Sequence, residues 1–194
     1  MNEFNINIHS DDNLIIECFK KGNKSAFNYL VLKYQKKIYW IIRQMVMNHD
    51  EADDITQEVF IKIYESMDSF RGDSKFFTYI YKIAVNFSIN HLNKAKRIFT
   101  ISSDFNMETY KLKSDDKNAD EIIDNNQRTK CLEEAIFSLP VQQRAVFNLR
   151  YYDNLSYEEI GKILNKSVGG MKANYFHAIK KIEDYLKKQR IFNE

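Results

Sequence analysis

Proline and glycine are scarce in this chain of 194 residues, which contains a single proline, Pro140, and five glycines. These two residue types are the strongest breakers of regular structure, so long helices meet few interruptions. Hydrophobic residues make up 44% of the chain, which is enough to build a substantial hydrophobic core. Together these observations predict an all-α protein.

Cysteine is also rare, and long apolar runs are missing. Cys18 and Cys131 lie far apart and lack the spacing of metal ligands, which predicts two reduced, partly buried thiols. The start of the chain lacks a basic segment followed by an apolar run, so an export signal is not indicated. No run approaches the ~18 apolar residues that a membrane span needs. We therefore expect a cytoplasmic protein that is not inserted in a membrane.

The formal net charge is only +2, so total charge alone does not indicate nucleic-acid binding. The charged side chains are distributed unevenly along the chain. Residues 1–98 carry 14 basic and 12 acidic side chains, residues 99–127 carry 3 and 7, and residues 128–194 carry 12 and 8. The middle segment is rich in Ser, Asp, Asn and Lys and lacks a hydrophobic period. This pattern predicts two small helical domains, 1–98 and 128–194, joined by a flexible acidic linker at 99–127.

Hydrophobic periodicity predicts the helices of both domains. A recurrence of apolar residues every three or four positions indicates an amphipathic helix. Two further helices flank Pro140, because proline is tolerated where a helix begins. The expected helices cover residues 11–20, 24–47, 51–67, 74–96, 127–138 and 141–152. In three of them we expect one apolar face to point toward the core: Phe27, Leu30, Val31, Tyr34, Ile38, Ile41, Ile42 and Met45 in 24–47; Ala52, Ile55, Val59, Ile63 and Met67 in 51–67; and Phe76, Ile80, Ile83, Ala84 and Phe87 in 74–96.

The last quarter of the chain has the layout of a helix-turn-helix. Residues 155–164 are predicted to form a short helix in which Ser156 and Glu159 complete a capping box. Ser167 can cap a longer basic helix over 171–186. A helix-turn-helix places its second helix in the DNA major groove. The alternative is an ordinary helical hairpin with a solvated basic face.

Two other groups of residues admit more than one interpretation. The acidic residues 50–58 could be stabilised by the positive end of a helix dipole, hold Mg²⁺, or form a protein-docking face. The helix over 74–96 carries lysines, asparagines and closely spaced aromatic residues. Amines and rings suit single-stranded DNA, although the rings could equally belong to the hydrophobic core.

The motifs follow one another in an order that resembles a known family. The chain is similar, from Asp11 to about Leu186, to bacterial sigma factors of the sigma-70 family, and specifically to the extracytoplasmic-function (ECF) group. The motifs that carry this resemblance are ADDITQEVF at 52–60, FRGD at 70–73, FFTYIYKIAVN at 76–86, Leu139-Pro140 and LSYEEI at 155–160.

The resemblance implies roles for individual residues. The helix that docks on core RNA polymerase corresponds to Asp53, Asp54, Gln57, Glu58 and Phe60. The segment that captures and melts the minus-ten element corresponds to Ser69, Phe70, Arg71, Gly72, Asp73, Lys75, Tyr79, Lys82 and Asn86, with the loop holding a flipped base. The reader of the minus-thirty-five element corresponds to Ser167, Gly169, Lys172, Ala173, Asn174, Phe176, His177 and Lys180.

Several positions depart from the family pattern, and among them Gly170 and Met171 replace the commoner threonine and valine at the start of the second helix. Tyr79 stands where tryptophan is usual, which preserves a ring that can stack on a base. Asn174 stands where arginine is frequent. Because asparagine pairs well with adenine and arginine with guanine, we expect an upstream element that is less rich in guanine.

The resemblance implies a promoter-specificity subunit rather than an enzyme, with no catalytic residue, cofactor or metal. Its implied partners are core RNA polymerase, promoter DNA as duplex and as melted strand, and an anti-sigma factor. Two alternatives remain at this point. An ordinary helix-turn-helix regulator would bind duplex operators as a dimer, and a metal-dependent helical enzyme would bind Mg²⁺ at the acidic cluster.

Overall fold

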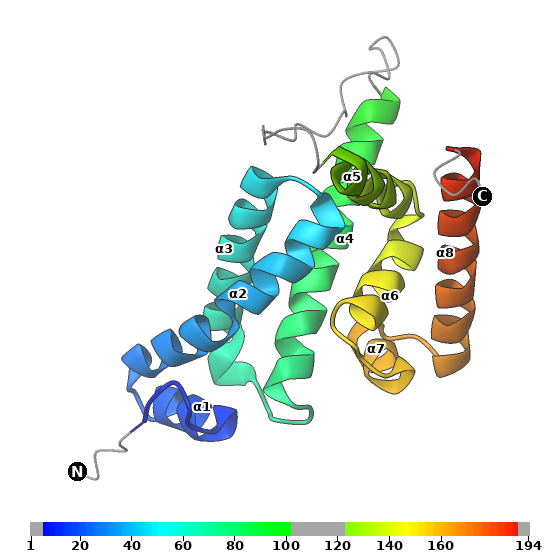
Figure 1. The fold of residues 1–194 in the computed structure, drawn as a ribbon. Helices are drawn as coiled ribbons and strands as arrows, with labels where there is room; N and C mark the ends of the chain where they lie inside the picture. Colours follow the sequence, from blue (N-terminus) through cyan, green and yellow to red (C-terminus); the bar gives the residue numbers. More distant parts are fainter. Residues whose placement is uncertain (1–5, 102–122, 190–194) are drawn as a thin grey trace. The chain divides into compact units, whose positions relative to one another are not determined.

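The computed structural model describes the backbone of residues 6–101 and 123–189 and the side chains of residues 6–97 and 127–189. Every regular element within these ranges is a helix, which confirms the predicted all-α class. The chain forms two compact units, Met1–Ser88 and Ile89–Glu194, which divide inside α4 (Figure 1). The domain limits at residues 98 and 128 stay a prediction.

The described α-helices range in length from 8 residues in α7 to 26 residues in α4. The elements of the first half of the chain are α1 (Asp12–Lys20), the 3₁₀ turn η1 (Lys24–Ala26), α2 (Phe27–Val46), α3 (His49–Ser66), the 3₁₀ turn η2 (Met67–Ser69) and α4 (Phe76–Ile101). The remaining helices are α5 (Ile123–Phe137), α6 (Val141–Tyr151), α7 (Tyr157–Leu164) and α8 (Val168–Lys188). No described helix combines the length and the apolar character that a bilayer crossing requires.

The predicted helices are present, but several begin at a different residue because of local capping. Asn48 accepts a hydrogen bond from the Glu51 backbone N–H at 3.0 Å, so α3 begins before the predicted residue 51. Ser167 accepts from the Gly170 N–H at 3.2 Å, so α8 begins before the predicted residue 171. The capping box of Ser156 and Glu159 is confirmed.

Helices extend into both ends of the segment that we predicted as a linker. The end of α4 includes residues 99–101 and the start of α5 includes residues 123–127. Neither stretch contains a proline or glycine that would stop a helix. The rest of the predicted linker, residues 102–122, lies outside the described residues.

The hydrophobic core of the first unit forms where α2 packs against α3 (Figure 1). The predicted inner face of α3 is confirmed, because Ala52, Ile55, Val59, Ile63 and Met67 are all buried. On α2 the predicted apolar face is also buried, except for Val31, which is half-buried. Helix α4 adds Phe76, whose ring lies 5.5 Å from that of Tyr34 on α2, measured between centroids.

The buried stripe of α4 is rotated relative to the prediction. Phe76, Ile80 and Ala84 are buried as expected, whereas the predicted core residues Ile83 and Phe87 are only half-buried. Four residues outside the predicted face are buried as well, namely Tyr81, Val85, Ser88 and Ile89.

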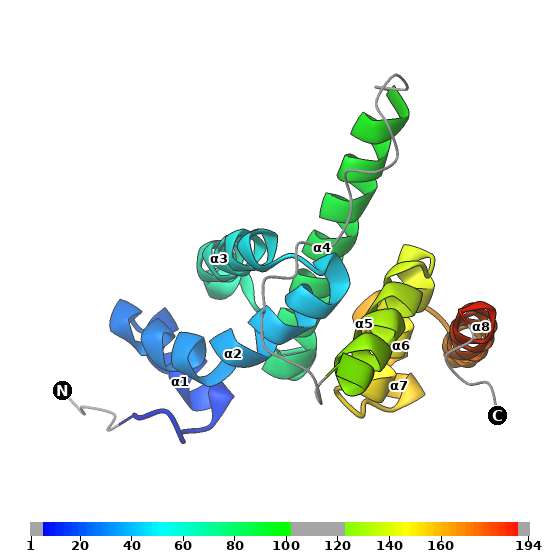
Figure 2. The same ribbon diagram turned by 45° about the horizontal axis from the view of Figure 1, so that its top comes forward.

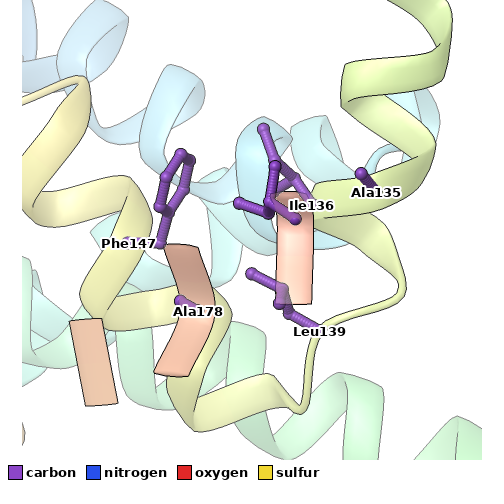
Figure 3. Close-up of a cluster of buried hydrophobic side chains, with 6 residues drawn as sticks. Ala135, Ile136, Leu139, Phe147 and Ala178 are labelled. Carbon is purple, nitrogen blue, oxygen red and sulfur yellow. The ribbon is translucent and has the colours of Figure 1, made fainter. Parts of the chain in front are cut away.

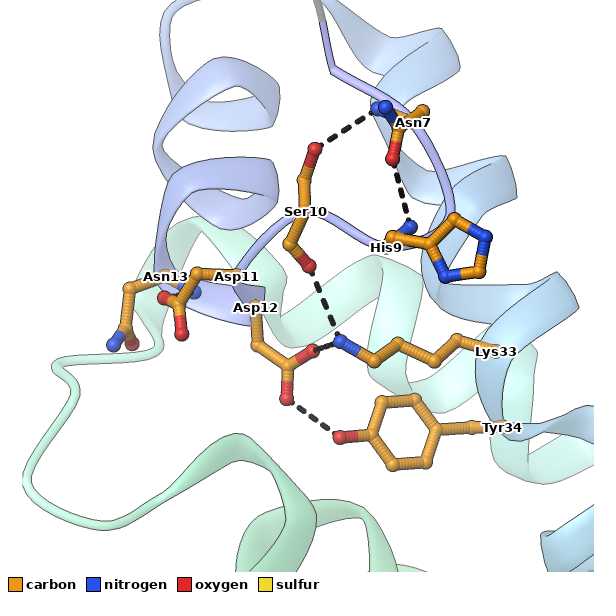
Figure 4. Close-up of polar contacts among 8 residues, drawn as sticks. All are labelled: Asn7, His9, Ser10, Asp11, Asp12, Asn13, Lys33 and Tyr34. Carbon is orange, nitrogen blue, oxygen red and sulfur yellow. Dashed lines mark hydrogen bonds and ion pairs between the residues drawn. The ribbon is translucent and has the colours of Figure 1, made fainter.

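The beginning of the chain is attached to α2 by one carboxylate (Figure 4). Asp12 accepts hydrogen bonds from the Lys33 ammonium at 2.7 Å and the Tyr34 hydroxyl at 2.5 Å. The same lysine donates to the Ser10 carbonyl oxygen at 3.2 Å. Burial and the bond to Asp12 raise the pKa of Tyr34 far above its usual range, so its hydroxyl remains a donor.

The C-terminal helices share a second hydrophobic core (Figure 3). Helix α8 packs against α5, α6 and α7 and lies beside α6 in both ribbon views (Figure 2). The buried residues of this core are Ala135, Ile136, Leu139, Phe147, Ala178 and Ile182. Both thiols, Cys18 and Cys131, are free and buried.

A buried arginine links α5 to α6. Arg144 is 5% exposed and donates to the carbonyl oxygens of Phe137 and Leu139, where α5 ends. Its guanidinium also lies over the Phe137 ring, 4.3 Å from the centroid. Burial lowers the pKa of Arg144 to about 10, so the side chain is still charged at neutral pH.

Candidate nucleic-acid and protein interfaces

The outer side of α3 is an acidic face, which we define as Asp53, Asp54, Gln57 and Glu58. All four side chains are exposed, because the buried stripe of α3 occupies the opposite side of the helix. His49 lies 3.6 Å from Asp53, one turn along the helix. Among the described residues, no three His, Cys, Asp or Glu side chains gather closely enough to hold a metal ion.

At two residues, the exposure of the side chain differs from what the sequence predicts for this face. Phe60, predicted to dock with the others, is only 9% exposed and its ring lies 6.5 Å from that of Phe27. It supports the face from beneath instead of forming part of its surface. Ile61 was not predicted, yet it is 59% exposed one turn beyond Gln57 and Glu58. The sequence signal for an exposed Ile61 was its position, because this apolar residue lies outside the spacing of the buried stripe of α3.

The loop between η2 and α4 exposes almost all of its predicted DNA-binding residues. Arg71, Gly72, Asp73 and Lys75 are exposed, and Gly72 has φ = +79°, a conformation that favours glycine. Phe70 differs, because it is 8% exposed. Its ring packs against Phe76 and Tyr79 on α4, with centroid distances of 5.9 and 4.8 Å, so it anchors the loop.

The outer side of α4 continues from this loop. Lys82 and Asn86 are exposed, and Tyr79 is half-buried with its hydroxyl 2.6 Å from the Ser66 Oγ. Among the closely spaced aromatic residues, Phe76 and Tyr81 are buried and cannot stack on a base. The rings of Phe77 and Tyr79 keep part of their surface accessible.

Helix α8 has one buried side and one polar side. Met171, Ala178 and Ile182 face the hydrophobic core. The exposed residues of the predicted reading face are Ser167, Gly169, Lys172, Ala173, Phe176, His177 and Lys180. Phe176 is 64% exposed, which is rare for phenylalanine within a folded helix.

Asn174 lies at the edge of this reading face and is half-buried. Its side-chain Nδ2 donates a hydrogen bond to the Gly170 carbonyl oxygen one turn earlier, at 2.8 Å. This bond uses one of the two amide hydrogens and leaves the other hydrogen for a further partner.

The turn before α8 fixes the direction of that helix. The Lys166 N–H donates to the Gly161 carbonyl oxygen at 2.9 Å, and Asn165 adopts a left-handed conformation with φ = 54°. A Cβ atom at Gly161 would lie 2.8 Å from the Lys166 carbonyl oxygen. The backbones therefore approach too closely for any residue other than glycine. Tyr157 on α7 also contacts α8, with its ring centroid 6.1 Å from that of Tyr175.

Comparison with known proteins agrees with this arrangement. The chain matches the family model described as Sigma-70 region 2 over residues 30–98 and the one described as Sigma-70, region 4 over residues 129–182. It is 34% identical to the RNA polymerase sigma-H factor of Pseudomonas aeruginosa over 181 residues, which cover 90% of this chain and 93% of the relative. It is 35% identical to the ECF RNA polymerase sigma-E factor of Escherichia coli over 179 residues, 89% of this chain and 93% of that protein.

A solved structure shares the fold. The sigma factor RpoE from Bartonella quintana, crystallised in complex with the anti-sigma factor NepR, matches with a TM-score of 0.64 and 20% identity. The match covers 83% of this chain and 96% of the other. Both family regions occur here in order, and the relatives match about nine tenths of the chain. The chain therefore belongs to the ECF group of the sigma-70 family, whose members bind core RNA polymerase and direct promoter recognition without being enzymes.

Proposed function

We propose that three surfaces of this sigma factor each bind a different partner in transcription initiation. The acidic face of α3 docks on core RNA polymerase, the loop 69–75 and outer side of α4 capture the minus-ten element, and the exposed side of α8 reads the minus-thirty-five element. One observation carries this proposal. Apart from Phe60 and Phe70, the side chains assigned to each surface lie away from the hydrophobic core and are at least partly exposed.

Docking through the acidic face follows from its charge. Asp54 and Glu58 lie one turn apart on the same side of α3, and Ile61 follows on that side. Charged residues around an exposed apolar residue provide steering and register for a basic partner surface. The apolar side chain supplies contact area that becomes buried on binding.

Capture of the minus-ten element combines three kinds of contact. We infer that loop 71–75 holds a base that has left the stack, because its residues are exposed and flanked by a rigid anchor at Phe70. Lys82 and Asn86 lie further along α4, where an ammonium group can hold a phosphate. The partly accessible ring of Tyr79 can stack on an unpaired base, which is worth ~1–3 kcal/mol.

Reading of the minus-thirty-five element follows the geometry of a helix-turn-helix. Lys172 and Lys180 on the exposed side of α8 can contact phosphates, while Asn174 and His177 can reach base edges. We infer that each unit alone binds DNA weakly and that docking on polymerase sets the spacing of the two. Specificity then comes from simultaneous engagement of both elements.

Replacing Asn174 with arginine tests the assignment of α8. Because arginine pairs with guanine through two hydrogen bonds, N174R is expected to enrich guanine at one upstream position by about tenfold. Holoenzyme is incubated with a pool of duplex DNA randomised over the upstream element, and bound molecules are sequenced.

Two controls make this selection decisive. Lys180→Met should weaken binding to all sequences without changing the preferred bases, because a phosphate contact carries no sequence information. The same selection without polymerase should give no enrichment. Enrichment by the chain alone would favour an ordinary helix-turn-helix regulator, and an unchanged preference in N174R would contradict the role of Asn174.

We also propose that an anti-sigma factor sequesters this chain in the cytoplasm. Support comes from the Bartonella quintana sigma factor, whose structure contains the anti-sigma factor NepR and shares this fold. Purification of the tagged chain from uninduced cells should recover a stoichiometric partner besides polymerase. Recovery of polymerase subunits alone would contradict sequestration.

A further inference from the structure

Two lysines near the end of α1 contact η2 and the residue that begins the loop before α4. Lys20, the last residue of α1, donates from its ammonium group to the Phe70 carbonyl oxygen. Lys24, in η1, lies 3.1 Å from both carboxylate oxygens of Asp68. Lys20 and Phe70 are 50 positions apart in the sequence, and Lys24 and Asp68 are 44 positions apart. Both contacts lie just before the exposed loop at residues 71–75.

Both lysines lie next to residues that are packed in the hydrophobic core. The Lys24 ammonium lies over the Phe19 ring, 3.9 Å from its centroid. Phe19 is 1% exposed and contacts Tyr64 on α3 edge to face, with a centroid distance of 5.3 Å. Helix α1 is therefore anchored to the same hydrophobic core that positions η2.

Phe70 is the point at which two sets of contacts meet. Its ring packs on α4 through Phe76 and Tyr79, and its N–H donates to the Met67 carbonyl oxygen at 3.2 Å. Its carbonyl oxygen accepts from Lys20. The ring and both polar backbone groups are thus fixed, and the exposed residues 71–75 begin immediately after this fixed residue.

We propose that Lys20 is a positioning residue for base recognition in the minus-ten element. It acts through the Phe70 carbonyl oxygen and contacts no DNA itself. A site that discriminates among bases must be held within about 0.5 Å of its productive geometry. Loss of the ammonium contact releases the first peptide of the loop. The difference in affinity between the preferred base and the other three bases then becomes smaller. This inference rests on the proposed role of loop 71–75 in holding a flipped base.

The test compares base preference within one sample. Holoenzyme is assembled with wild type or variant chain and mixed with forked DNA whose exposed non-template strand is randomised over the minus-ten region. Sequencing of bound molecules gives the enrichment of the preferred base over the others at the most selective position. Partial unfolding lowers binding to all four bases equally, so this ratio does not respond to a merely structural defect.

Three variants separate positioning from other effects. Lys20→Met should lower the ratio about three- to tenfold, the range expected for one charge-assisted hydrogen bond that is partly exposed. Lys20→Arg should keep the ratio within about twofold of wild type, because arginine is also a cationic donor. Lys21→Met is the matched control and should leave the ratio unchanged, since Lys21, which follows α1 directly, pairs with Glu17 of that helix at 2.5 Å.

Each contrary outcome has a distinct meaning. A wild-type ratio in Lys20→Met, or an equal loss in Lys21→Met, would overturn the positioning role while leaving the proposed function intact. Absence of any base preference in the wild-type holoenzyme would overturn the proposed role of the loop, and the inference with it.

Discussion

Reversal of the charges at Asp54 and Glu58 to lysine should reduce the affinity of this chain for core RNA polymerase by at least about a hundredfold. Juxtaposing like charges at an interface costs several kcal/mol, and each 1.4 kcal/mol is a factor of ten in affinity. Both residues are exposed on α3, so their replacement removes no packing. The measurement is fluorescence anisotropy of labelled chain titrated with core polymerase.

The control for this experiment carries the same change in charge on a different helix. Glu183 and Asp184 are exposed on α8, outside the predicted reading face. Their replacement by lysine should leave polymerase affinity within about threefold of wild type, as expected for charges remote from the interface. An unchanged affinity in the Asp54 and Glu58 variant would contradict docking through the acidic face.

Salt dependence adds a second criterion to the same titration. Attraction between exposed charges is screened over about 8 Å at physiological ionic strength. Wild-type affinity should therefore fall as salt is raised, while the charge-reversed variant should lose much of this dependence.

Gly161→Ala should destabilise the C-terminal helices by about 1–3 kcal/mol, the usual cost of forcing extra volume into a close-packed site. The new methyl group would lie 2.8 Å from the Lys166 carbonyl oxygen, which belongs to the backbone and cannot move without displacing the turn. Because this turn directs α8, transcription that depends on the minus-thirty-five element should fall as well.

Gly169→Ala provides a matched comparison for stability. A Cβ atom at Gly169 meets nothing within 4 Å, and alanine is about 1 kcal/mol better than glycine within a helix. Hydrogen exchange followed by mass spectrometry reports both variants, with peptides from α2 and α3 as an internal reference. Faster exchange in α7 and α8 is expected for Gly161→Ala and not for Gly169→Ala. Equal exchange in the two variants would contradict the steric account.

The helices could be predicted from the sequence because their signals are local. Apolar spacing identified the buried stripe of α3, and the residue types at positions 156 and 159 identified a capping box that the structure contains. The cap at Asn48 was available in the sequence as well, but a histidine and an acidic run follow it instead of an apolar one. The predicted start of α3 was therefore late.

The division between surface and hydrophobic core within the motifs was harder to predict. Phe60 and Phe70 belong to motifs with exposed partners, yet both rings are buried. A motif identifies which residues act together, whereas burial depends on which helix covers them. The same holds for α6, where Arg144 and Asn148 are buried among apolar residues because neighbouring helices enclose that face.

Contacts between distant segments have no local signal at all. The bond from Lys20 to the Phe70 carbonyl oxygen joins the end of α1 to a loop that follows α3. A lysine at the end of a helix is ordinary, since cations are favourable there. The packing of α1 against α2 and η2 places this lysine beside the start of the loop at residues 71–75.

As a member of this family, the chain confers promoter specificity on RNA polymerase. The most direct measurement is transcription in vitro with core polymerase from the source organism and fragmented genomic DNA, with and without the chain. We predict new transcripts that start at discrete sites, preceded by two shared upstream elements. Absence of new transcripts, together with specific duplex binding by the chain alone, would contradict it.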